Sequence, residues 1–117
     1  MTFIADFRPA SIFSAALVLS FAATAPAHAA CSDAAAPDVD WGGCDLIGVN
    51  LIAEDLIGAN LIAEDLSGAD LSGADLSGAD LTDAILTDAI LSGADLTYAY
   101  LNNANLVGAN LQNAILY

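Results

Sequence analysis

Carboxylates and one pair of cysteines are the side chains of this 117-residue sequence that could do chemistry. The chain has 15 Asp and Glu residues against one Lys or Arg and one His, for a formal net charge of −14. Paired carboxylates can act as general acid and base, but catalysis also needs a nucleophile or a positive group beside them. Since the chain has almost no bases to activate a Ser or to stabilise an oxyanion, we predict a protein that is not an enzyme and has no cofactor.

The same acidic chain is strongly apolar. It is 57% hydrophobic with a mean hydropathy of +0.65, whereas disordered acidic segments are poor in apolar residues. The near absence of positive charge excludes nucleic acid and anionic membrane surfaces as partners. The composition therefore predicts one small folded domain with an acidic surface.

The N-terminal segment, 1–30, has the pattern of a signal peptide. A small, apolar stretch from Ala10 to Ala25 is too short to span a bilayer, and Ala29 and Ala30 end a small-residue cleavage motif. We expect cleavage after Ala29 or Ala30 and export to the periplasm or the medium; the alternative is a retained anchor or a buried helix. Cleavage would remove Arg8 and His28, so the mature chain would have no basic side chain.

Cys31 and Cys44 are the two cysteines. In an exported domain they are expected to form one disulfide, which would add about 2–4 kcal/mol of stability by closing a short loop. Two alternatives are a buried, unpaired Cys44 and a lipid anchor on Cys31, although His28 stands where a lipobox has Leu, Val or Ile. A metal site is not expected, because two cysteines fall short of four ligands.

A five-residue repeat fills the rest of the chain. Fifteen leucines recur at this spacing without interruption. Two residues before the Leu stands a small residue, usually Ala, and between the two most repeats have Asp or Asn. They are Leu46, Leu51, Leu56, Leu61, Leu66, Leu71, Leu76, Leu81, Leu86, Leu91, Leu96, Leu101, Leu106, Leu111 and Leu116.

A period of five fits neither a helix nor a flat strand. Leucines five apart do not form one stripe on a helix, and they alternate between the faces of a strand. A chain that turns about 90° after every repeat does bury them, because four repeats close a square coil with every Leu on its axis. Ser-Gly pairs such as Ser72-Gly73 suit the corners, since Gly accepts the positive φ of a type II turn.

The run from Gly68 to Leu81 resembles the pentapeptide-repeat family, whose repeat reads Ala-Asp/Asn-Leu-x-x. The resemblance implies an all-β fold, a right-handed quadrilateral parallel β-helix, with about 3.75 coils of four repeats. The expected organisation is a signal peptide over 1–30, a leader and N-terminal cap over 31–43, and the β-helix over 44–117. Val39 and Trp41 are the candidates for closing the N-terminal end of the coil stack.

Glu54 and Glu64 break the repeat, because they occupy the inward position that is usually small. A buried carboxylate is costly without a partner, so we expect a distorted first coil that lets both reach solvent. If they point inward instead, their pKa values should be raised; a bound cation is the third alternative.

The outer surface carries the candidate contact residues. Ile47, Ile52, Ile57 and Ile62 each follow a Leu and should face outward as an apolar girdle, either as a contact surface or merely as good strand residues. The apolar C-terminal end favours end-to-end homodimers, the alternative being a frayed half-coil.

The predicted function is a non-catalytic exported module with a structural or protein-binding role and an unknown protein partner. The family resemblance implies one alternative, an acidic DNA mimic that inhibits a DNA-binding protein such as gyrase. Binding of divalent cations along columns of Asp is another.

Overall fold

Residues 33–117 form one continuous stack of coils in a computed structural model of the protein, which describes these residues only. Within them the chain contains no helix and no strand longer than a single bridging residue. The predicted signal peptide, the predicted cleavage positions Ala29 and Ala30, and Cys31 lie outside the described residues.

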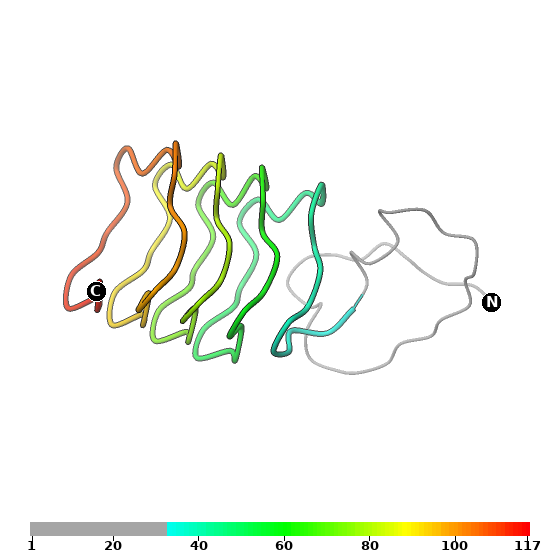
Figure 1. The fold of residues 1–117 in the computed structure, drawn as a ribbon. Coiled ribbons are helices and arrows are strands. Elements are labelled where there is room, and N and C mark those ends of the chain that lie inside the picture. The colour runs from blue at the N-terminus through cyan, green and yellow to red at the C-terminus, as the bar shows by residue number, and fades with distance from the viewer. Residues whose placement is uncertain (1–32) are drawn as a thin grey trace, which may run out of the picture.

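Neighbouring coils are joined as parallel strands, in which each bridging residue pairs with its equivalent in the next coil. Asp55 bridges to Asp75 and Asp75 to Asp95, and the same spacing runs from Asp40 to Ile115. Since the repeat is five residues long, the step from Asp55 to Asp75 comprises four repeats, as predicted for one coil. Figure 1 shows these coils stacked along one axis from the cyan to the red end of the chain.

Each repeat ends in a tight corner whose geometry explains the Ser-Gly pairs. The amide of Ala74 donates to the carbonyl of Leu71 at 3.0 Å, which closes a four-residue turn, and Gly73 within it has a φ of 67°. Positive φ at only the third turn residue is the mark of a type II turn. The predicted role of glycine at the corners is therefore confirmed.

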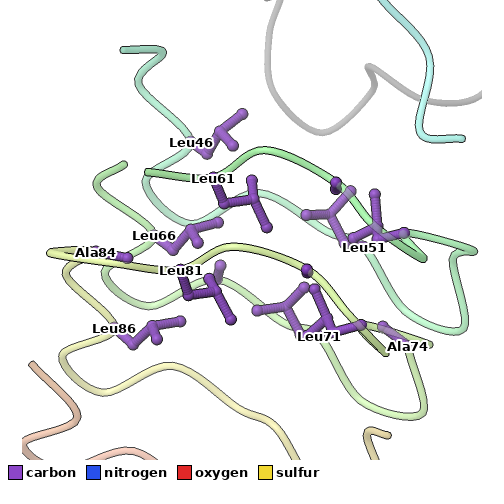
Figure 2. Close-up of a cluster of buried hydrophobic side chains, with 14 of the residues drawn as sticks. Leu46, Leu51, Leu61, Leu66, Leu71, Ala74, Leu81, Ala84 and Leu86 are labelled. Carbon is purple, nitrogen blue, oxygen red and sulfur yellow. The ribbon is translucent and has the colours of Figure 1, made fainter. Parts of the chain in front are cut away.

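Leucine and alanine ladders fill the interior. The leucines from Leu51 to Leu91 are fully buried, and so are most of the alanines that precede them. Figure 2 shows Leu46, Leu66 and Leu86 in one column inside the coils, with Leu61 and Leu81 in another. Because each residue packs on its equivalents in the adjacent coils, the core is continuous along the stack.

The coil geometry begins earlier than the leucine series. Trp41 and Ala36 occupy the position that Leu holds in later repeats: the amide of Val39 donates to the carbonyl of Ala36, and that of Trp41 to Asn60 in the next coil. Trp41 is fully buried and Val39 is 8% exposed. Both proposed capping residues thus belong to the stack itself, in the coil that covers its N-terminal end.

The C-terminal coil is the less covered end of the described rod. Leu101, Leu106 and Leu111 are only partly buried, although they hold the same inward position as the fully buried leucines before them. The cause is that residues 97–117 pack against one neighbouring coil, whereas inner coils pack against two.

Gly73→Ala is expected to lower the free energy of unfolding by about 1 kcal/mol, because φ near +67° disfavours any side chain. A Cβ at Gly73 meets nothing within 4 Å, so no clash contributes. The reverse change, Ala63→Gly, removes an alanine from a φ of 59° and should raise stability by about 0.5 kcal/mol. Urea unfolding measures both; a neutral Gly73→Ala would contradict the argument.

Candidate functional site

The carboxylates that precede each Leu hold the corners together. Asp70 Oδ1 accepts the amide of Ser72 at 3.1 Å and its hydroxyl at 2.5 Å. Asp65, Asp75, Asp80 and Asp95 repeat both bonds with the Ser or Thr two residues on. At Asp95 the hydroxyl of Thr97, followed by its amide, lowers the pKa of the carboxyl. One carboxylate oxygen of each of these five acids therefore stabilises a corner by accepting two hydrogen bonds.

Asp70→Ala is expected to cost about 1–2 kcal/mol of stability, because the amide of Ser72 loses a charged acceptor. Asp70→Asn should cost much less, since Asn50 and Asn110 make the same amide bond in this protein. Thermal unfolding of the two variants separates the bond from the charge. An equal loss in both would show that the charge, not the corner bond, matters.

The outer acids form columns, and the longest has an acid in three successive coils before Ile115 follows. Asp55, Asp75 and Asp95 lie on one wall, joined by successive bridges. On two other walls the acid gives way to an apolar residue: Asp65 bridges to Ile85, and Asp70 to Ile90. The negative surface is thus a single three-residue column on one wall and shorter runs elsewhere.

Glu64 is the exception to the apolar interior. Its side chain is fully buried, so the expectation that it reaches solvent is wrong; Glu54, in the same coil, is half-buried. Glu64 Oε1 accepts the amide of Cys44 at 2.7 Å, while Oε2 has no hydrogen-bond partner. Burial raises the pKa of Glu64 to about 7; the amides of Cys44 and Gly43 oppose this, and Asp45 and Asp65 add to it.

The difference between the two glutamates follows from what lies one coil before each. Glu64 lies in register with Cys44, which is 7% exposed and part of the core. Glu54 lies in register with Ala34, beside the start of the described chain. Sequence spacing predicts the same inward position for both glutamates and contains no signal for the difference in how deeply their side chains are buried.

Four isoleucines project from the corners, as predicted. Ile47, Ile52, Ile57 and Ile62 are 40–54% exposed, one at each corner of a single coil. Their amides donate to the preceding Asp or Asn, like those of Ser and Thr in later coils. The corner bond to the backbone therefore forms with Ile as well, and their role as a contact surface stays a prediction.

Residues 33–117 hold no group of three or more His, Cys, Asp or Glu side chains arranged for a metal ion. The same stretch also contains no helix with the length and hydrophobicity of a membrane span.

The fold and its corner chemistry define a solenoid repeat protein, built from stacked coils with a leucine core. A family model for pentapeptide repeats matches residues 44–88 and 89–117 with eight copies. The match covers more than half of the sequence, so the chain belongs to the pentapeptide repeat family. Proteins of this family are generally structural modules without catalytic activity.

Solved structures of the same family resemble the chain. Rfr23 of the cyanobacterium Cyanothece is 29% identical over 74% of this chain and 65% of its own, with a TM-score of 0.53. HetL of the cyanobacterium Nostoc is 43% identical over 62% of this chain and 38% of its own, with a TM-score of 0.44. The chain thus spans less than two thirds of either relative. Comparison with curated proteins finds no match.

Together, the family match and the likeness to Rfr23 support the right-handed quadrilateral β-helix. The observed register between coils agrees with it, because four five-residue sides make one turn.

Proposed function

We propose that this protein is an exported, non-catalytic β-helical module that binds a protein partner through the exposed isoleucines of its N-terminal coils. In this proposal the fifteen leucine repeats make about 3.75 coils, and 1–30 is removed as a signal peptide. The cap of residues 31–43 then leads directly into the stack.

The observation that carries the proposal is the exchange of Ser and Thr for Ile at equivalent corners. Ser67, Ser72 and Ser77 each give a hydroxyl bond to the preceding Asp, which Ile cannot make. Ile47, Ile52, Ile57 and Ile62 give up that bond and keep 40–54% of their surface exposed. A side chain that adds nothing to the corner and exposes apolar area is typical of a contact surface.

The matched variants are Ile47→Ser and Val107→Ser, because both residues occupy the same corner column three coils apart. Both changes should leave stability within about 0.5 kcal/mol, since exposed positions tolerate substitution. Tagged protein recovered from the envelope and culture fluid should lose much of its co-purifying partner with Ile47→Ser and keep it with Val107→Ser. Equal recovery with both would contradict the proposed surface.

Export and the disulfide are tested on the same material. Fractionation and mass measurement should show a chain that begins at residue 30 or 31, in the periplasm or the medium. Cys44 has no free thiol, which supports a disulfide between Cys31 and Cys44. The two cysteines should therefore react with an alkylating reagent only after reduction. An uncleaved cytoplasmic product would contradict export, and a mass increase on Cys31 matching lipid would favour the anchored form.

End-to-end homodimers are a second form of contact, supported by the partly buried leucines of residues 97–117. Leu106→Glu should then shift the molecular mass measured by light scattering from dimer to monomer. A wild-type chain that is monomeric at all concentrations would contradict the proposal.

The acidic wall favours one further candidate, a mimic of the DNA backbone. Its support is the column of Asp55, Asp75 and Asp95, whose stacking distance is about 4.8 Å. Against it stand Ile85 and Ile90, which interrupt two of the other three columns. Inhibition of gyrase supercoiling by the purified mature protein would favour mimicry, and no inhibition at micromolar concentrations would exclude it.

A further inference from the structure

The ladder between coils is broken at one corner. At most corners the third residue of the turn donates its amide to a carbonyl in the next coil. Gly48, for example, donates to the carbonyl of Ser67 at 2.9 Å, and Ala53 to that of Ser72 at 2.8 Å. The equivalent bond from Gly43 to Ile62 is absent. The carboxyl of Glu64 takes its place, accepting from Cys44 at 2.7 Å and interacting with the amide of Gly43.

In the folded protein the amides of Cys44 and Gly43 are the groups that stabilise a charge on this carboxyl, and burial outweighs them. The carboxyl is fully buried, Oε2 has no partner, and residues 33–117 contain no Lys, Arg or His. The titratable groups that act on it are Asp45 and Asp65, and both repel a negative charge. Its raised pKa, about 7, has the same origin. An ionised Glu64 therefore has to reach water.

The corner that Glu64 contacts lies at the surface, because Gly43 is exposed beside the buried Cys44. Beyond this corner the chain leads back to Trp41, in the N-terminal coil of the described rod. Its bonds to the next coil include those from the amides of Asp38 and Trp41 to Ile57 and Asn60, and one from the amide of Asn60 back to Val39. The Trp41 indole donates to the carbonyl of Asp33 at 3.2 Å and is fully buried.

We propose that Glu64 makes the N-terminal coil a pH-sensitive cap, in which ionisation of Glu64 releases the Gly43–Cys44 corner and exposes Trp41 to water. At acidic pH the neutral carboxyl remains inside and the cap is closed. At alkaline pH the charge moves outward, the corner opens, and apolar core surface at this end becomes accessible. The leucine ladder of the inner coils stays intact.

Trp41 reports the opening directly, because it is the single Trp of the chain. We would measure its emission maximum and its quenching by acrylamide from about pH 5 to pH 9 on the full-length chain. The expected result is a red shift and a several-fold rise in the quenching constant, with a midpoint near the pKa of about 7. A flat profile in the wild-type chain would overturn the proposal.

Three variants assign the transition. Glu64→Gln should remove it, whereas Glu54→Gln and Asp33→Asn, at the same end of the rod, should keep it with its midpoint unchanged. If Glu64→Gln does not fold by circular dichroism, Glu64→Ala replaces it, because Ala84 and Ala104 hold the equivalent position in later coils. Persistence of the transition without Glu64 would overturn the proposal.

Amide exchange separates local opening from unfolding of the whole rod. After correction for intrinsic rates, the amides of Trp41 and Leu46 should lose protection across the transition, while those of Leu76 and Leu81 keep theirs. Equal loss at all four amides would mean that the rod unfolds as a unit, which would contradict a cap.

Discussion

Replacing Leu71 with Ala is expected to lower the free energy of unfolding by about 3 kcal/mol. Leu71 is fully buried in the middle of the rod, so truncation removes apolar contacts and leaves a cavity. Leu→Ala changes in rigid cores cost about 2–5 kcal/mol, and neighbours fixed by ladder bonds on both sides have little freedom to close the gap. Urea unfolding followed by circular dichroism measures the loss.

Leu106→Ala is the matched control, because it makes the same change at the same repeat position in the less covered C-terminal coil. Leu106 is partly buried, so its loss should be clearly smaller than that of Leu71. Equal losses would mean that the last coil is covered in solution, and concentration-dependent unfolding would then identify a second copy of the chain as the cover.

The stability of the rod should fall by about 3 kcal/mol as the pH rises from about 4.5 to about 7. The unfolded chain loses the Glu64 proton near pH 4.5, whereas the folded chain keeps it up to about pH 7. Because the folded state binds more protons in this interval, its advantage is complete below about pH 4.5 and lost above about pH 7. Denaturant titrations at a series of pH values measure the slope.

Glu64→Ala isolates this effect from the rest of the charge. Repulsion among the surface acids also weakens as the pH falls, so the quantity to compare is the difference between wild type and variant. That difference should grow in favour of Glu64→Ala as the pH rises, and the variant should be the more stable protein above about pH 7. A constant difference across the pH range would contradict a buried, titrating Glu64.

Most of the fold followed from the spacing of one residue type. Because five-residue leucine spacing fits no helix and no flat strand, it required a coil with four corners. The outward Ile and the positive φ of Gly73 then followed from that register. The start of the coil geometry before Leu46 was not detected, because Ala36 and Trp41 hold the leucine positions there.

The site was less predictable because its properties depend on neighbours one full coil away along the chain. The bond between Asp70 and Ser72 had a visible signal, a hydroxyl two residues after an acid in five of the repeats. Burial of Glu64 had none, since it depends on Cys44 in the preceding coil and on a ladder bond that Gly43 does not make. Local sequence states which side of the coil a residue takes, but not how well that side is covered.

The register between coils also limits how the gene for such a rod can change in length. Hydrogen bonds between coils join pairs such as Leu76 with Asp95 and Asp95 with Ala74. Residues on one wall therefore stay in register only when the chain between them makes a whole number of turns. Deleting one repeat between Asp75 and Asp95 would leave each corner intact but turn every later column to the next wall, and so divide the acidic column. Deleting four repeats would shorten the rod by one coil and keep its surface in order. Insertions and deletions that preserve a binding face should therefore come in sets of four repeats.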